Sequence, residues 1–353
     1  MRAAKIVAST LLLLLASLAR VPSGYADASH AETLTVEGTT VRLPLGLQAD
    51  AAYVPEGNPP TPARVALGRF LYFDKRLSLD KTVACATCHM PSHGYAEPRA
   101  TSQGVGGKVG SRNAPTVLNR LFSKEQFWDG RATDLEDQAK GPLVNPIEMT
   151  MGTHDAVVAR IKEVPGYAPL FEKAFGTPEI TIARAAQAIA SFERVVLTGN
   201  SPFDRQQAGE AGAMTPAAQR GMAIFNGKGN CATCHSGFNF TDESYHNLGV
   251  GMDAAKPDLG RYEVTKLDVD RGAFKTPTLR NVTQTAPYMH DGSETTLRDV
   301  VVFYDVGGRQ NPWLSKEIRP LGLSDAEVDD LVAFLESLTG PITETAVPAQ
   351  LPQ

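Results

Sequence analysis

All four cysteines of the chain lie in two pentapeptides of the form Cys-x-x-Cys-His, one at residues 85–89 and one at residues 231–235. Two thiols with this spacing reach the two vinyl groups of one porphyrin, and the imidazole that follows then lies beneath the iron. The motifs therefore predict two covalently bound haem c groups. The predicted thioether cysteines and proximal histidines are Cys85, Cys88, His89, Cys231, Cys234 and His235.

A Cys-x-x-Cys pair also has other uses, namely a redox-active dithiol and a zinc site built from two such pairs. A single pair would leave these possibilities and chance open. Here both pairs are followed directly by histidine, and the chain begins with an export signal. This combination favours haem attachment, with zinc as the main alternative.

The N-terminus has the organisation of a secretory signal peptide. Arg2 and Lys5 precede an apolar stretch at residues 6–18, and Gly24 and Ala26 are small residues at the two cleavage positions. No later segment approaches the roughly 20 apolar residues that a membrane-spanning helix needs. Export together with haem attachment predicts a periplasmic protein without a membrane span.

The charge of the chain argues against one class of partner. The sequence contains 39 acidic and 34 basic residues, for a formal net charge of -5, and the predicted signal peptide contains no acidic residue. The mature chain is therefore still more acidic. A net acidic surface argues against nucleic acid as a partner.

The segment before each haem motif begins in the same way. Thr61-Pro62-Ala63 leads to Gly68 in the first segment, and Thr215-Pro216-Ala217 leads to Gly221 in the second. Threonine followed by proline is typical of the start of a helix, so a helix is predicted before each haem motif. The repetition indicates a duplicated unit.

Helical patterns recur through the rest of the chain. Apolar residues follow helical spacing at residues 155–161, 182–197 and 296–304, and a capping box at Ser324 predicts a closing helix. Strand signals are weak. The predicted fold is mostly α, with two cytochrome c-like haem domains related by duplication and joined by long loops.

Four segments are expected along the chain. Residues 199–202 and the Gly- and Ala-rich residues 207–214 indicate a surface linker, which puts the domain boundary near residue 208. The end is rich in proline and is expected to be loose. The predicted segments are a signal peptide (1–26), an N-terminal domain with haem 1 (27–208), a C-terminal domain with haem 2 (209–340) and a flexible tail (341–353).

Several short segments together resemble one known family. They occur in order at residues 112–115 (Arg-Asn-Ala-Pro), 127–131 (Phe-Trp-Asp-Gly-Arg), 138–142, 145–149 (Asn-Pro-Ile-Glu-Met), 201–204, 274–281 and 287–292 (Pro-Tyr-Met-His-Asp-Gly). On these residues the sequence resembles the bacterial dihaem cytochrome c peroxidase family, which includes the MauG proteins of methylamine utilization. The resemblance implies that haem 1 cleaves peroxide and that haem 2 handles electrons or stores oxidising equivalents.

The resemblance also implies roles for catalytic residues. Glu148 would move a proton between the two peroxide oxygens, as a positioned general acid-base does. Trp128 would lie between the haems, and Gln138 and Pro142 would line the distal pocket. The alternatives are a solvated loop carboxylate for Glu148 and an ordinary core tryptophan for Trp128.

A calcium site between the two domains is a further implication of the resemblance. Asn113 and the backbone carbonyls of Thr285 and Pro287 match its ligands, and oxygen ligands suit a hard cation. Three ligands are too few for calcium, so water molecules would complete the shell.

Two positions distinguish the subtypes of the family. The displaceable histidine of haem 1 would fall at Val105, which cannot bind iron, and His93 does not match a ligand position. Haem 1 is therefore expected to be open. The second axial ligand of haem 2 is a methionine in the peroxidases, but the matching residue is Tyr304, as in MauG, with Met289 as the rival. A phenolate stabilises ferric and higher states, whereas a thioether favours ferrous iron.

These residues lead first to a MauG-type function. Hydrogen peroxide, or oxygen plus electrons, would oxidise the haem pair to a high-valent state that withdraws electrons from tryptophans of a protein substrate. In the family, this reaction completes the tryptophan tryptophylquinone cofactor of methylamine dehydrogenase. One departure weakens the match, because Gly229 replaces the tryptophan that MauG has two residues before its second haem motif.

Two other functions are possible. A cytochrome c peroxidase would reduce hydrogen peroxide to water with electrons from a small electron-transfer protein, and Glu148 and Trp128 are compatible with this reaction. A dihaem electron carrier would have no chemistry of its own. An open haem 1 beside an acid-base residue argues against the carrier.

Overall fold

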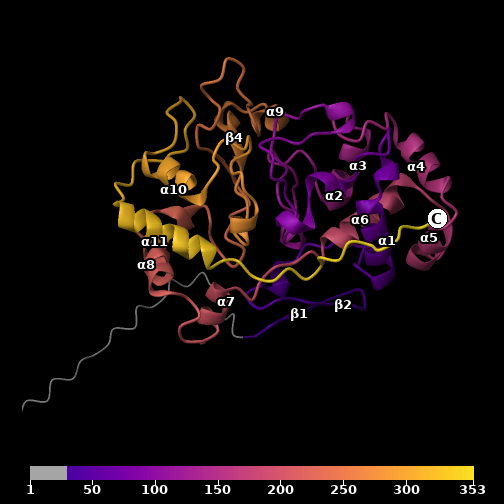
Figure 1. Cartoon of the computed structure of the whole chain (residues 1–353), viewed down its shortest axis with the longest axis horizontal. Helices are drawn as coiled ribbons and strands as arrows, with labels where there is room; N and C mark the ends of the chain where they lie inside the picture. Colours follow the sequence, from indigo (N-terminus) through magenta and orange to yellow (C-terminus); the bar gives the residue numbers. More distant parts are fainter. Residues whose placement is uncertain (1–29) are drawn as a thin grey trace, which may run out of the picture.

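The structure is a computed structural model that describes residues 30–353, so the signal peptide predicted at residues 1–26 lies outside the described residues. The described chain is mostly helical, as predicted, and forms two cytochrome c-like modules side by side (Figure 1). The helices are α1 (Pro62–Phe73), α2 (Cys85–Cys88), α3 (Leu135–Val144), α4 (His154–Lys162), α5 (Tyr167–Phe175), α6 (Ile182–Glu193), α7 (Pro202–Gln207), α8 (Pro216–Asn226), α9 (Tyr262–Thr265), α10 (Leu297–Asp305) and α11 (Asp325–Glu336).

The strands in the described part of the chain form two small antiparallel pairs. β1 (Thr33–Val36) pairs with β2 (Thr39–Arg42), and β3 (Tyr245–Asn247) pairs with β4 (Ala273–Lys275). The first pair lies along the lower edge of the molecule in Figure 1. Most of the regular secondary structure in residues 30–353 is therefore helical.

Each module is built around the crossing of two helices in close contact. In the N-terminal module, α1 crosses α6 at Gly68, where an added Cβ would lie 1.8 Å from the carbonyl oxygen of Ala188. In the C-terminal module, α8 crosses α11 at Gly221, where a Cβ would lie 1.9 Å from the carbonyl oxygen of Asp330. Only glycine permits this approach. The matching contacts support the duplication.

The predicted helix starts are confirmed. Thr61 accepts a hydrogen bond from the amide of Arg64 at the start of α1, and Thr215 accepts one from Ala218 at the start of α8. Ser324 forms the predicted capping box at the start of α11. Each cap satisfies an amide that the first turn leaves without a helical partner.

The prediction of a surface linker is wrong at Ser201, which is buried. Ser201 and Asp204 are each at most 1% exposed, and Asp204 forms an ion pair with Arg280, which is also 1% exposed. The polar composition suggested contact with water, but these groups satisfy one another in the interior. The domain boundary near residue 208 itself stays a prediction.

The C-terminal tail differs from the loose segment that its proline content suggested. It runs from the C-terminal module across to the N-terminal module (Figure 1). The Gly166 amide donates to the carbonyl of Gln353 at 2.7 Å, and Arg76 donates to the carbonyl of Pro352 at 2.9 Å. These contacts are made by backbone carbonyl groups. Their partners cannot be predicted from the amino-acid composition of the tail.

None of the helices in the described residues 30–353 is both long enough and apolar enough to cross a membrane.

Candidate haem-binding and active site

The two predicted haem motifs each open onto a cavity. The haem 1 cavity is lined by the cysteines and the histidine of residues 85–89, and the haem 2 cavity by those of residues 231–235. None of the four cysteines, all within residues 30–353, forms a disulfide. Two thiols and an imidazole at the wall of each cavity form the donor set that covalent haem attachment needs, so the residues present fit haem c.

Each motif forms a short helical turn that fixes its histidine. α2 contains the first pair of cysteines. The 3-10 turn η6 (Cys231–Thr233) begins at the first cysteine of the second pair and is followed directly by the second. The amide of His89 donates to the carbonyl of Cys85, and that of His235 to the carbonyl of Cys231, both at 2.9 Å. The two imidazoles therefore leave their turns in equivalent places.

The two proximal histidines differ in their hydrogen bonds. Nδ1 of His235 lies 3.0 Å from the carbonyl oxygen of Phe240 and donates to it, which leaves Nε2 for iron. Nδ1 of His89 is buried and has no hydrogen-bond partner among residues 30–353. Burial lowers the pKa of both imidazoles. Both are therefore neutral at pH 7, the form that binds a metal.

Glu148 lies in the wall of the haem 1 cavity, in the loop after α3. Its Oε1 accepts a hydrogen bond from Nδ2 of Asn145 at 2.8 Å, which fixes the carboxyl group. Burial raises the pKa of Glu148, and the positive charge of Arg131 only partly opposes this shift. A carboxyl group with a raised pKa can act as a proton donor near neutral pH.

Helix α3 supplies the other predicted residues of the distal pocket. Gln138 and Pro142 both line the haem 1 cavity, and residues four apart lie on the same face of a helix. Pro142 has no amide proton, so the carbonyl of Gln138 loses its helical partner. The structure thus brings Gln138, Pro142 and Glu148 into one cavity with His89.

Val105, the position predicted to leave haem 1 open, lies directly beside the acid. Its amide donates to the carbonyl of Glu148 at 2.9 Å, and its side chain is 7% exposed. The neighbouring Gly104 permits this contact, because a Cβ there would lie 1.9 Å from the carbonyl oxygen of Ile147. An apolar residue therefore occupies the position that matches the displaceable histidine of the family.

Tyr304 lines the haem 2 cavity from α10, together with Leu297, Val300 and Val301 of the same helix. The spacing of these residues puts them on one helical face. Burial raises the pKa of Tyr304, so its phenol stays protonated unless a cation lies beside the oxygen. Met289 lines the same cavity, so the choice of Tyr304 as the ligand stays a prediction.

Trp128 lines both cavities, as expected of a residue between the haems. Its Nε1 donates to the carbonyl of Asn113 at 2.9 Å, and its own carbonyl accepts from the amide of Lys275 on β4 at 2.8 Å. Residues of both modules therefore hold Trp128, Asn113 through the indole and Lys275 through the backbone carbonyl. Its electron-transfer role stays a prediction.

The three residues matched to a calcium site lie together. Asn113, Thr285 and Pro287 all line the haem 2 cavity. Nδ2 of Asn113 donates to the carbonyl of Arg99 at 2.9 Å, which leaves its Oδ1 as the possible cation ligand. His93 lies beside this group and not at iron, since its Nε2 is 2.6 Å from the carbonyl oxygen of Ala286.

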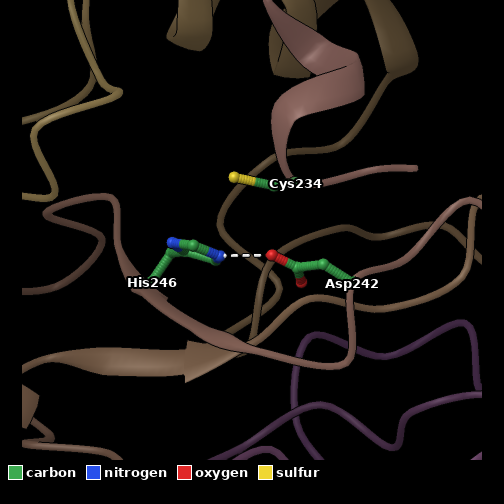
Figure 2. Close-up of side chains that lie close together, drawn as sticks. All are labelled: Cys234, Asp242 and His246. Atoms are coloured by element: carbon green, nitrogen blue, oxygen red, sulfur yellow. Dashed lines mark hydrogen bonds and ion pairs between the residues drawn. The ribbon is translucent and has the colours of Figure 1, made fainter.

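The sequence did not reveal an ion pair at the edge of the haem 2 cavity. Nε2 of His246 lies 2.8 Å from Oδ2 of Asp242, and the Sγ atom of Cys234 lies within 4.8 Å of the pair (Figure 2). The hydrogen bond to Asp242, followed by that to the Cys234 thiol, raises the pKa of His246, and the Asp242 carboxylate favours the cationic imidazole. Because Cys234 is needed for the haem thioether, these residues are better described as a charged haem edge than as a metal site.

A loop of the C-terminal module closes the haem 1 cavity. Lys256, Asp258 and Glu263 line that cavity although they lie near haem 2 in the sequence. Arg112 of the N-terminal module donates from Nε and Nη2 to Asp258 at 2.7 and 2.8 Å. Sequence order alone could not predict this exchange between modules.

Gly229 lines the haem 2 cavity beside Cys231. An added Cβ at Gly229 would lie 2.9 Å from the carbonyl oxygen of Ile224 and 3.2 Å from Sγ of Cys231. A tryptophan at this position would therefore require the backbone to shift. The other tryptophan apart from Trp128 is Trp313, which is 37% exposed.

Two haem c modules that share a wall, with a buried carboxyl group in one cavity, define a dihaem c-type oxidoreductase. Residues 62–212 match the family described as di-haem cytochrome c peroxidase, and residues 218–339 match the cytochrome c family. The chain belongs to the di-haem cytochrome c peroxidase/MauG family and is a haem-dependent oxidoreductase, on the relatives that follow.

The methylamine utilization protein MauG of Methylorubrum extorquens is 46% identical over 301 residues, covering 84% of each chain. The cytochrome c551 peroxidase of Nitrosomonas europaea is 38% identical, and the match covers 90% of this chain and 94% of that protein. The crystal structure of a MauG-like protein associated with microbial copper homeostasis has a TM-score of 0.75 and 32% identity, covering 82% of this chain and 93% of that chain.

Proposed function

We propose that the protein is a periplasmic MauG-type oxidoreductase that uses hydrogen peroxide, or oxygen plus electrons, to oxidise a protein substrate. The proposed substrate is a precursor of methylamine dehydrogenase, in which the reaction would complete the tryptophan tryptophylquinone cofactor. The observation that carries this proposal is the asymmetry of the cavities, with an acid beside Val105 in one and Tyr304 in the other. Relatives named MauG, 46% and 40% identical, support it.

When bound, the two haems supply the iron that takes up the oxidising equivalents of peroxide. Glu148 does the proton chemistry in the haem 1 cavity. Its Oε1 is held by Asn145, so Oε2 takes the proton from one peroxide oxygen and delivers it to the other, which leaves as water. Gln138 orients the peroxide, and Pro142 narrows the pocket against larger ligands.

Electron exchange and calcium belong to the same proposal. Trp128 would carry electrons between the cavities, because its indole lines both and is fixed by the carbonyl of Asn113. Tyr304 would bind the iron of haem 2. Asn113, Thr285 and Pro287 would hold one calcium ion at the wall between the modules, with water in the remaining positions.

Gly229 favours a second candidate function. A cytochrome c peroxidase needs no surface tryptophan, because a small electron-transfer protein delivers single electrons to haem 2. The glycine at this position cannot accept a larger side chain without a backbone shift, which removes the exit that MauG uses. Relatives named cytochrome c peroxidase support this alternative.

One experiment separates the two functions. The holoprotein is given peroxide with either reduced cytochrome c or a methylamine dehydrogenase precursor, and the oxidation of each is followed. We expect precursor oxidation to exceed cytochrome turnover. Rapid cytochrome turnover with an unchanged precursor would reject the MauG-type assignment.

Electron paramagnetic resonance tests the structural premise of both functions. The ferric protein is expected to give one high-spin haem and one low-spin haem, and two low-spin signals would remove the open site. Tyr304→Met is expected to raise the potential of haem 2, because a thioether favours ferrous iron. An unchanged potential would mean that Tyr304 only packs.

A further inference from the structure

The last turn of α6 brings a second carboxyl group to the haem 1 cavity, and the proposed reaction does not use it. Glu193 lines the cavity and is only 5% exposed. Within the described range 30–353, no hydrogen bond holds its carboxyl group, and the group faces the cavity. A carboxyl group in such a weakly polar place is unfavourable and calls for an explanation.

The duplication supplies an internal comparison for this position. A Cβ at Gly68 would meet the Ala188 carbonyl and the Cβ of Phe192, and one at Gly221 would meet the Asp330 carbonyl and the Cβ of Phe334. In both modules the phenylalanine follows four residues after the carbonyl. Phe192 therefore corresponds to Phe334.

The next residue along each helix is the position of interest. Glu193 follows Phe192 on α6, and Leu335 follows Phe334 on α11. Leu335 lines the haem 2 cavity and is 7% exposed, as Glu193 lines the haem 1 cavity. The positions one turn earlier, Ile189 and Leu331, also line their cavities, which supports the correspondence.

The comparison shows that packing does not require an acid here. Leucine fills the equivalent place in the C-terminal module, with the same helix crossing and nearly the same burial. A leucine would also avoid the unfavourable burial of a carboxyl group. An acid at the haem 1 position is thus specific to the module with the predicted reactive haem.

The charged groups around Glu193 leave its carboxyl group mostly neutral. Arg194 is bound to Glu136 at 2.6 and 2.7 Å, and Arg120 is bound to the side chain of Gln126 at 2.8 Å. Tyr72 of α1 and Cys85 of α2 face it as uncharged groups. Burial outweighs the two arginines and raises the pKa of Glu193 to about 8.

We propose that Glu193 is a proton-exchanging group that couples electron transfer at haem 1 to the loss of a proton. Haem 1, when bound, would supply a one-electron redox change. Glu193 would release one proton and become a carboxylate when an electron leaves, and it would take the proton back when the electron returns. Peroxide is the oxidant in the reaction of the enzyme, and an electrode with mediators replaces it in the test.

Spectroelectrochemical titration of the holoprotein between pH 5 and pH 9 tests the coupling. In the wild type, the potential of haem 1 falls as the pH rises, at a slope of up to about 59 mV per pH unit, the value for one proton per electron. Glu193→Gln, which has the same shape but cannot ionise, loses this dependence. Glu193→Leu, which installs the residue of the other module, also loses it, whereas Glu193→Asp keeps it.

Infrared difference spectra give a second, independent readout. Reduction of haem 1 is expected to produce the band of a protonated carboxyl group, and this band is absent in Glu193→Gln. A slope for haem 1 that is the same in Glu193→Gln as in the wild type would overturn the proposal. The proposal would also be overturned if Glu193→Gln changed the pH dependence of the potential of haem 2 as much as that of haem 1. None of these measurements uses a protein substrate, so they stand or fall apart from the MauG-type function.

Discussion

The two haem modules share a helix crossing and differ in the side chains that face their cavities. In both, a glycine lets two helices approach so closely that a Cβ would lie within 1.9 Å of a carbonyl oxygen. In both, the turn that begins at the first cysteine also fixes the backbone of the histidine. The acids that line the haem 1 cavity include Glu148 and Glu193, and burial raises the pKa of both. The haem 2 cavity has Tyr304 and Leu335 at its walls. Backbone contacts thus determine where a haem can sit, and a few side chains determine what each haem can do.

The titratable groups near the two cavities also differ. Burial raises the pKa of both Glu148 and Glu193 at the haem 1 cavity, so each keeps its proton to a higher pH than an exposed carboxyl group does. The haem 2 cavity has the His246 imidazolium at its edge, paired with Asp242. Groups that can release protons favour a centre that gains positive charge during its reaction. This difference agrees with peroxide chemistry at haem 1.

The largest expected effect comes from removing Glu148, the proposed general acid-base of the haem 1 cavity. Glu148→Gln should lower the rate of peroxide turnover by roughly 10²- to 10⁴-fold, the usual contribution of a general acid-base. The rate is measured by stopped-flow spectroscopy with excess peroxide. Glu263→Gln is the matched control, because Glu263 lines the same cavity but has no assigned role in proton transfer. Equal losses in both variants would mean that cavity charge, and not a specific acid, supports the reaction.

A smaller effect is expected at the ion pairs that fix each module. Asp204 and Arg280 are both 1% exposed, whereas Glu136, the partner of Arg194, is 17% exposed. Asp204→Asn leaves a buried guanidinium without a counter-ion, so it should lower the free energy of unfolding by about 3 to 5 kcal/mol. Glu136→Gln should have a smaller effect, since water reaches its carboxylate. Chemical denaturation of the holoprotein measures both, and a larger loss in Glu136→Gln would contradict the prediction.

The shared helix crossing predicts equal effects in the two modules. Gly68→Ala and Gly221→Ala should each lower the free energy of unfolding by about 1 to 3 kcal/mol, because an added Cβ overpacks a close contact. Gly110→Ala is the control, since a Cβ there would only reach ordinary contact at 3.5 Å. Thermal unfolding followed by far-ultraviolet circular dichroism measures all three. A clear inequality between Gly68 and Gly221 would show that the modules do not depend on the crossing alike.

The sequence predicts what local patterns encode. The Cys-x-x-Cys-His spacing located both cavities, and Thr-Pro pairs located the starts of α1 and α8. It could not predict that Asp258 of the second half closes the first cavity, because that contact joins residues 146 positions apart. Nor could the sequence predict that Glu193 faces this cavity, because its position follows from the crossing of α6 with α1 at Gly68. Such positions become visible only when the two helix crossings are compared in space.

A pH-dependent effect is expected on the stability of the module with the second acid. Glu193 has an ordinary pKa near 4.5 when unfolded and a pKa of about 8 when folded. Between these values the folded protein binds a proton that the unfolded chain has released, so the free energy of unfolding falls as the pH rises. The decline ends above the folded pKa.

Glu193→Gln removes the contribution of Glu193 to the pH dependence of stability. The measurement is the difference in melting temperature between variant and wild type, in which the effects of the other titrating groups cancel. The variant should therefore gain on the wild type as the pH rises from 5 to 8.5, because only the wild type must keep a buried proton. Leu335→Gln is the control for a polar amide at the equivalent position of the other module, and its difference from the wild type should not depend on pH. A constant difference for Glu193→Gln would mean that Glu193 is ionised in the folded protein, and that the two cavities differ less in charge than in shape.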